Sequence, residues 1–117
     1  MGRLPEPARR RLVECLDEAA DASALGETAR MWTLLEDAHV LSQPSAYLHV
    51  RVHIRMLVAG LKSRDRTEVR GQLVRLLVAA PGSWSGRYPV GNTGRARIPA
   101  TRSMPIRADI EALLDHG

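Results

Sequence analysis

Three of the four histidines of this chain, together with one glutamate, lie in the short stretch EDAHVLSQPSAYLHVRVH (residues 36–53). Glu36 and His39 are three residues apart, and His49 and His53 are four residues apart. On a helix, either spacing places both side chains on one face. Glu-x-x-His and His-x-x-x-His pairs are units from which helical metal sites are built. The stretch therefore predicts a metal site.

A turn at Pro44 would bring the two pairs together. The residue before a proline is disfavoured in the helical conformation, so we expect one helix to end there and another to begin just after it. His39 and His49 each lie five residues from Pro44, while Glu36 and His53 lie eight and nine residues from it. In an antiparallel hairpin, residues equidistant from the turn lie opposite each other. We therefore expect His39 to face His49, and Glu36 to face His53.

Imidazole and carboxylate together suit a divalent first-row transition metal, here Zn, Fe or Cu. Three protein ligands would leave a coordination position for catalysis, whereas four would indicate storage or structure, so the pattern leaves enzyme activity open. Gln72 falls between apolar residues of its predicted helix. A buried amide needs hydrogen-bond partners, and we expect Gln72 to bond a histidine from behind the metal or to bond the following loop. In the alternative interpretation, the histidines are hydrogen-bonded packing residues, and Glu36 pairs with His39 or with a nearby arginine.

Helical periodicity accounts for most of the chain, and no segment alternates with the period of a strand. Antiparallel hairpins follow from the short links between predicted helices, and a Leu-Leu-x-x-Ala pattern before a proline occurs twice, near tetratricopeptide spacing. We therefore expect one all-α domain over residues 1–117, either tetratricopeptide-like or a small bundle. The predicted helices cover residues 6–21, 27–42, 45–62, 66–80 and 106–115.

Two predicted helices carry strong apolar patterns. The helix 45–62 is apolar nearly all round, which is typical of an interior helix with neighbours on several sides. The helix 66–80 has one apolar stripe that we expect to face the core, made of Val69, Leu73, Leu76, Leu77 and Ala80.

Residues 81–105 have no helical stripe and are rich in glycine, proline and arginine. We expect Pro81-Gly82 to end the preceding helix and this long irregular loop to be ordered, wrapping the helices ahead of the short C-terminal helix. The turn sequence Gly-Asn-Thr-Gly at 91–94 can present backbone N–H groups to an anion. Together with nearby arginines, it makes Arg87, Asn92 and Arg95 candidate contacts for an anion or a protein partner.

The composition excludes several classes of protein. The single cysteine, Cys15, rules out a disulfide framework within the chain and is expected to be a core residue. No apolar run approaches the roughly 20 residues of a membrane span, and the first residues lack a secretory signal, so we expect a cytoplasmic protein with no membrane contact. Net charge is +4, but nearly all basic residues are arginine, which is typical of a GC-rich coding sequence. Nucleic acid is therefore not the expected partner.

Several strings in the chain, AHVLSQP, HVRVH, RGQLVRLL, PVGNTG and SMPI, resemble a small family of uncharacterised bacterial proteins, a domain of unknown function. The resemblance covers about residues 30–114 and implies no particular activity. Two functional hypotheses follow from the residues. One is a metal-binding helical protein. The other is a tetratricopeptide-like interaction module with structural histidines, whose groove and arginine-rich loop bind an acidic peptide or a partner helix. For either hypothesis the partner is a small molecule or a protein, and a homodimer is one possibility.

Overall fold

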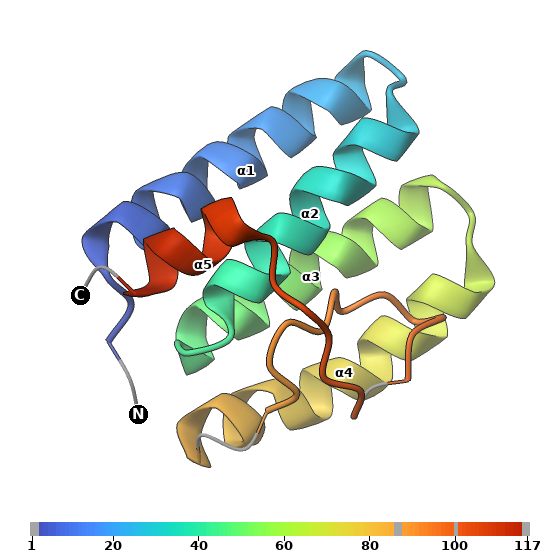
Figure 1. The fold of residues 1–117 in the computed structure, drawn as a ribbon. Coiled ribbons are helices and arrows are strands. Elements are labelled where there is room, and N and C mark those ends of the chain that lie inside the picture. The colour runs from blue at the N-terminus through green and yellow to red at the C-terminus, as the bar shows by residue number, and fades with distance from the viewer. Residues whose placement is uncertain (1–2, 86–87, 100, 116–117) are drawn as a thin grey trace.

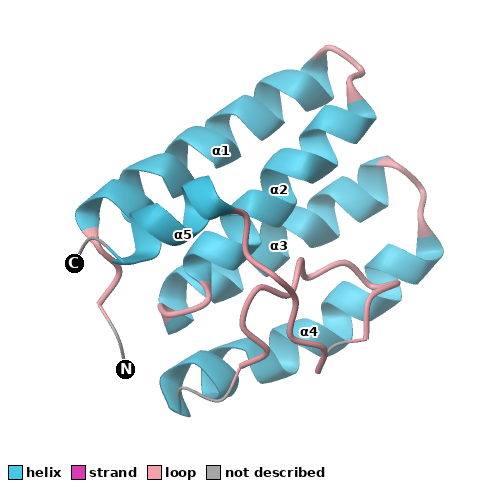
Figure 2. Ribbon diagram, viewed as in Figure 1, coloured by secondary structure: helices cyan, strands magenta, loops and turns pink. Residues whose placement is uncertain are grey.

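A computed structural model describes residues 3–85, 88–99 and 101–115 of the chain, with the backbone alone for 78–85. Within these residues the fold is all-α, as predicted, and the helices are linked by turns and one long irregular segment (Figures 1 and 2). The helices are α1 (Glu6–Ala24), α2 (Thr28–Ser42), α3 (Ala46–Lys62), α4 (Arg66–Ser85) and α5 (Ala108–Asp115).

Short turns fold α1 to α4 into consecutive antiparallel hairpins, and α5 packs back against α1 and α2 (Figure 1). The turn between α1 and α2 contains Gly26 at a φ of 74°, a backbone conformation that costs glycine little. Ser45 caps α3 by accepting a hydrogen bond from the Leu48 N–H, and Asp65 accepts one from the Glu68 N–H at the start of α4. These caps fix the residues at which α3 and α4 begin and hence the positions of the side chains in their first turns.

Two predicted helix ends are too early, because α1 continues to Ala24 and α4 continues through Pro81 and Gly82 to Ser85. A proline within a helix removes one backbone hydrogen bond, but its ring holds φ near the helical value, so the helix can continue beyond it. The irregular segment therefore begins after Ser85 rather than at Pro81.

The apolar core lies between α1, α2, α3 and α5, and it is built from aliphatic side chains with one tryptophan, Trp32. Leu12 of α1, Leu41 of α2 and Met56 of α3 are each buried to within 1 % of full burial. Cys15 is a fully buried core residue, as its position on the apolar face of α1 predicts. Burial of this aliphatic surface holds the first three helices together.

The interior beside α4 is polar instead. Among the described side chains of this helix, the buried ones are Glu68, Gln72 and Arg75, which share one helical face. Leu73 and Leu77 are 51 % and 80 % exposed, so the prediction that the apolar stripe of this helix faces the core is wrong. Hydrogen-bonding groups on α3 and in the irregular segment turn the polar face of α4 inward.

The prediction that α3 is an interior helix with neighbours on several sides is confirmed only in part, because α2 and α4 pack against it while part of its apolar surface is exposed. Val52, Met56 and Ala59 are buried in the core, whereas Ile54 and Leu61 are 46 % and 58 % exposed. Between these two faces, the buried imidazoles of α3 point towards α2 and α4 and begin the polar interior.

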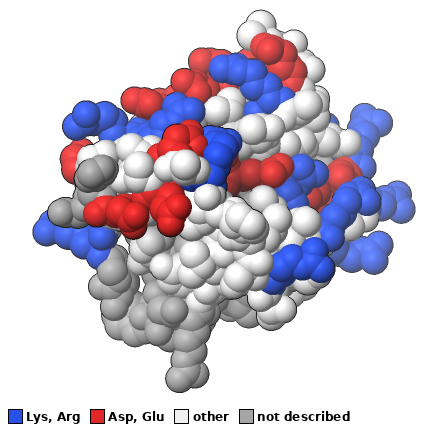
Figure 3. Space-filling view, viewed as in Figure 1, with Lys and Arg blue, Asp and Glu red and all other residues white. Residues whose placement is uncertain are grey.

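No helix in the described part of the chain is long and apolar enough to cross a lipid bilayer. On the face shown in Figure 3, acidic and basic side chains are mixed over α1, α2 and α5, and a broad uncharged area lies below them. The net positive charge is therefore not gathered into one field over these helices.

Candidate metal centre

Three buried histidines meet at a single point between α2 and α3. His39 comes from α2, and His49 and His53 lie one helical turn apart on α3. The Nε2 atom of His39 is 3.0 Å from those of both His49 and His53, and the latter two are 3.2 Å apart. The side chains are between 2 % and 6 % exposed. Three imidazole nitrogens thus form a nearly equilateral triangle inside the protein.

Hydrogen bonds behind the rings fix the tautomers of His39 and His53. The Nδ1 atom of His39 lies 2.7 Å from the backbone oxygen of Asn92, and that of His53 lies 2.6 Å from Oε1 of Gln72. A carbonyl oxygen only accepts hydrogen bonds, so both Nδ1 atoms must carry the proton. In the neutral rings, Nε2 then has a lone pair, and the two lone pairs are directed towards the centre of the triangle.

The Gln72 amide can adopt only one orientation in this site. Its Nε2 donates to Oε2 of Glu68 at 3.0 Å and to the Gly94 carbonyl at 2.8 Å. Both partners are acceptors, which assigns the NH₂ group to that side and leaves the Gln72 oxygen for His53. The predicted contact between Gln72 and a histidine is therefore present, and it orients the ring.

The short distance between the Nε2 atoms of His39 and His53 is compatible with a cation between them. Two lone pairs 3.0 Å apart cannot make a hydrogen bond without a proton between them. A proton on Nε2 of His49 could form a hydrogen bond to His39 or to His53, but it cannot lie between the Nε2 atoms of His39 and His53. Burial lowers the pKa of His39 well below the usual range and lowers the pKa of His53 to about 4. Neutral imidazoles, which are the form that binds metal, are therefore favoured at neutral pH.

The spacing is close to that of a tetrahedral metal site. Zinc–nitrogen bonds of about 2.0–2.1 Å at tetrahedral angles place the nitrogens about 3.3 Å apart. The three separations of 3.0 to 3.2 Å need only a small expansion to reach that value. All ligand atoms of the three histidines lie within 4.8 Å of one another, and this group is the candidate cation site.

Glu68 lies behind Gln72 and accepts a hydrogen bond from its amide. Its carboxylate is fully buried and accepts hydrogen bonds from Nε of Arg95 at 2.5 Å and from the Ala96 N–H at 3.0 Å, besides the bond from Gln72. The Arg95 guanidinium also stacks on the Trp32 ring, 3.8 Å from its centroid. The Glu68 carboxylate, paired with the Arg95 guanidinium, thus lies one residue behind His53, with Gln72 between them.

Glu36, the fourth predicted ligand, is not part of the histidine cluster. Its Oε2 lies 3.3 Å from Nη1 of Arg95, and the side chain is 30 % exposed. Burial raises the pKa of Glu36, and the neighbouring Arg95 opposes that change. The hairpin thus brings together His39, His49 and His53, while Arg95, distant in sequence, holds Glu36 apart.

The segment 88–99 covers the site from one side. Asn92 uses its side chain within this loop, donating to the Pro99 and Arg102 carbonyls and accepting from the Gly94 N–H. The Gly91 N–H donates to Gln43. The Gly91, Asn92 and Gly94 amides, expected to be available to an anion, are therefore used within the chain, as is Arg95. The third candidate contact, Arg87, lies outside the described residues.

Glycine is required at position 94. Its φ is 83°, and a Cβ atom there would lie 2.5 Å from Cδ2 of His39. Only a residue without a side chain allows the loop backbone to lie against the imidazole. Through this contact and the carbonyls of Asn92 and Gly94, the segment 88–99 positions His39 directly and His53 through Gln72.

Sequence reasoning missed Glu68, Gly94 and the Asn92 carbonyl. Glu68 lies four residues before Gln72, a spacing that places both side chains on one helical face. That shared polar face was the available signal. Nothing in the sequence pairs a backbone carbonyl at position 92 with His39.

A family model described as "Protein of unknown function (DUF3703)" matches residues 7–114. The chain belongs to this family. No curated protein and no solved structure matches the chain. The DUF3703 match covers all three histidines as well as Gln72 and Glu68, so the whole site lies within the family domain.

Proposed function

We propose that this protein binds one transition-metal ion through the Nε2 atoms of His39, His49 and His53. The observation that carries the proposal is the pair of fixed tautomers. Carbonyl acceptors hold the protons of His39 and His53 on Nδ1, so two lone pairs meet 3.0 Å apart in a buried space. A metal ion placed between them would turn an unfavourable contact into coordination bonds.

The ligand set favours zinc, with copper and iron as alternatives. Imidazole nitrogen suits Zn, Cu, Fe and Ni, whereas Mg, Ca and Mn prefer oxygen ligands. Glu36 is engaged with Arg95, so the set has three neutral ligands and leaves one position for water or another donor. Because all three rings are buried, we expect the ion to be held firmly rather than exchanged rapidly.

The polar groups behind the histidines support this function. Zinc-bound histidines usually donate their other N–H to a carboxylate or carbonyl, which raises the basicity of the ligand. His39 has the Asn92 carbonyl in that place, and His53 has Gln72, which in turn donates to Glu68. The Glu68 carboxylate would partly offset the positive charge of the bound cation.

The interaction-module hypothesis has less support. It relied on arginines of the irregular loop being available to an acidic partner. Arg95 instead pairs with Glu36 and Glu68 and stacks on Trp32. No contact among the described residues favours this hypothesis over metal binding.

Elemental analysis of the untagged protein, followed by titration of the metal-free protein with Zn(II), tests the proposal. We expect about one equivalent of metal per chain, lost in His49→Ala and His53→Ala. A metal concentration about 1,000 times the dissociation constant should stabilise the fold by about 4 kcal/mol.

Glu36→Gln is the matched control, because it alters a carboxylate near the site that is not a proposed ligand. We expect this variant to keep its metal. Loss of metal from Glu36→Gln would return Glu36 to the ligand set. If the wild-type protein carries no metal, and Zn(II), Cu(II) and Fe(II) leave its unfolding temperature unchanged, the proposal is wrong.

A further inference from the structure

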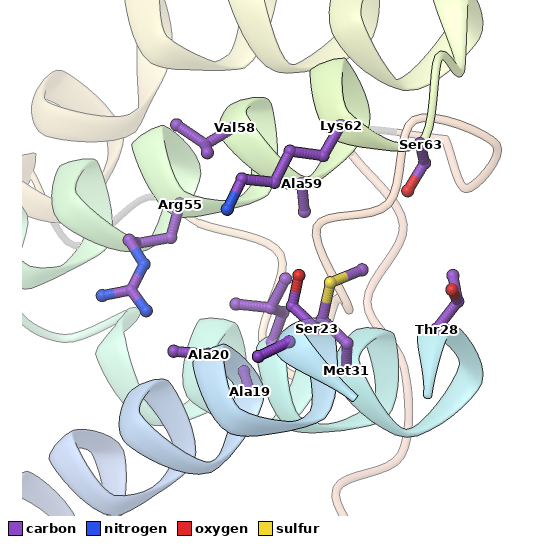
Figure 4. A pocket seen from close by; sticks show the side chains of 12 residues that line it. Ala19, Ala20, Ser23, Thr28, Met31, Arg55, Val58, Ala59, Lys62 and Ser63 are labelled. Atoms are coloured by element: carbon purple, nitrogen blue, oxygen red, sulfur yellow. The ribbon is translucent and has the colours of Figure 1, made fainter. Parts of the chain in front are cut away.

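A groove of about 580 Å³ lies between α1, α2 and α3, away from the histidines (Figure 4). Its α3 wall includes Arg55, Val58 and Lys62, which by helical period lie on the opposite side of α3 from His53. The volume is within the range of small-molecule sites. The groove is thus separate from the candidate metal centre.

The groove has a continuous apolar part, and Ser23, Thr28 and Ser63 also line it. Alanines of α1 and α3, Met31 and Leu35 of α2, and Val58 of α3 make up the apolar part. Figure 4 shows Met31 and Ala19 on one wall, facing Val58 and Ala59 across the opening. Such a surface favours the hydrocarbon part of a ligand.

The charged groups of the groove have one sign. Arg55 and Lys62 line it, and none of the described residues that line it is an aspartate or a glutamate. In Figure 4 the Lys62 side chain extends along α3 towards the Arg55 side of the opening. Neither cation belongs to an ion pair between described residues.

Arg55 is held in place without being neutralised. Its Nη2 donates to the Leu16 carbonyl at 3.0 Å, which fixes the guanidinium at the edge of α1. A guanidinium has five N–H donors, so the others remain for a ligand. A fixed guanidinium beside an apolar surface is the arrangement that recognises a carboxylate attached to a hydrocarbon chain.

We infer that this groove binds a small carboxylate with an apolar tail. The tail lies on the alanine, Met31 and Val58 surface, and the carboxylate lies between Arg55 and Lys62. This inference does not depend on metal binding, because it uses none of the residues of the histidine cluster.

Calorimetric titration with octanoate, below its micelle concentration and in both metal-free and zinc-treated protein, tests the inference. We expect saturable binding of one octanoate per chain, with octanol at least tenfold weaker because it lacks the charge. The double variant Arg55→Gln/Lys62→Gln should weaken octanoate about tenfold or more. Ala20→Trp, at an exposed position that lines the groove, should abolish binding by filling it.

The matched control is Arg51→Gln/Arg66→Gln, which removes the same charge from exposed positions outside the groove. It should bind octanoate as the wild type does. Absence of saturable octanoate binding, equal affinity for octanol, or equal weakening by the control pair would each overturn the inference. Because the metal content is measured separately, a negative result here leaves the metal proposal standing, and the reverse also holds.

Discussion

Replacing Gln72 with leucine should weaken metal binding beyond its effect on the fold. Leucine has a similar size, so the change removes hydrogen bonds without opening a large cavity. It removes the acceptor of His53 Nδ1 and two donated bonds, to Glu68 and to the Gly94 carbonyl. With its N–H unpartnered, the His53 ring is free to turn its lone pair away from the other two histidines.

The expected magnitude follows from these three buried hydrogen bonds. Each contributes about 1 kcal/mol net, and more where a buried partner is left unsatisfied. The metal-free Gln72→Leu protein should therefore lose about 3 to 5 kcal/mol of unfolding free energy. Loss of the group that orients a metal-bound histidine typically weakens metal affinity tenfold to a hundredfold, and we expect zinc affinity to fall by that factor.

Gln43→Leu is the matched control for this prediction. Gln43 is equally buried and makes two hydrogen bonds to the same loop, to the Pro89 carbonyl and from the Gly91 N–H, but none to a histidine. It should lose about 2 to 3 kcal/mol of stability with little change in zinc affinity. Urea unfolding gives the stabilities, and competition with a coloured zinc chelator gives the affinities. Unchanged zinc affinity in folded Gln72→Leu, or an equal fall in Gln43→Leu, would refute the reasoning.

Two further predictions concern pH and the loop. Burial lowers the pKa of His53 to about 4 from an unfolded value of 6.5, so below pH 6.5 the unfolded chain binds the extra proton. The metal-free protein should therefore be most stable above pH 6.5, and its free energy of unfolding should fall by about 3 kcal/mol by pH 4. His53→Gln should reduce this loss. Unfolding curves recorded at several pH values would measure it. Gly94→Ala places a Cβ against His39 at a φ of 83°, so it should cost at least about 1–2 kcal/mol of stability and should also weaken zinc binding. Gly26→Ala should cost stability alone. An unaltered zinc affinity in Gly94→Ala would contradict the proposed role of the loop.

The meeting of the three histidines could be predicted from local rules. His49 and His53 share a helical face, and the turn at Pro44 determines which residues of the two helices lie opposite. These are short-range constraints, and the sequence contains them. The position of Glu36 could not be predicted in this way, because its partner Arg95 lies 59 residues further along the chain.

The orientation of α4 was also beyond sequence reasoning. Apolar periodicity shows that Leu73 and Leu77 share a face, but it does not tell which face is buried when the other carries Glu68 and Gln72. The free energy of satisfying that polar face depends on the histidines of α3 and on the loop carbonyls. The loop has no periodicity, so its docking against α2 and α4 could not be derived from the pattern.

The acceptor that orients His39 is the backbone carbonyl of Asn92. A change of side chain at position 92 does not delete a carbonyl, so this half of the site cannot be lost by a simple exchange of functional groups. It can be lost only when the path of the loop changes, for example through Gly94 or through the side-chain bonds of Asn92. Part of the proposed metal site therefore depends on the shape of the loop, and variants that disturb that shape should behave like ligand mutants although every histidine is intact.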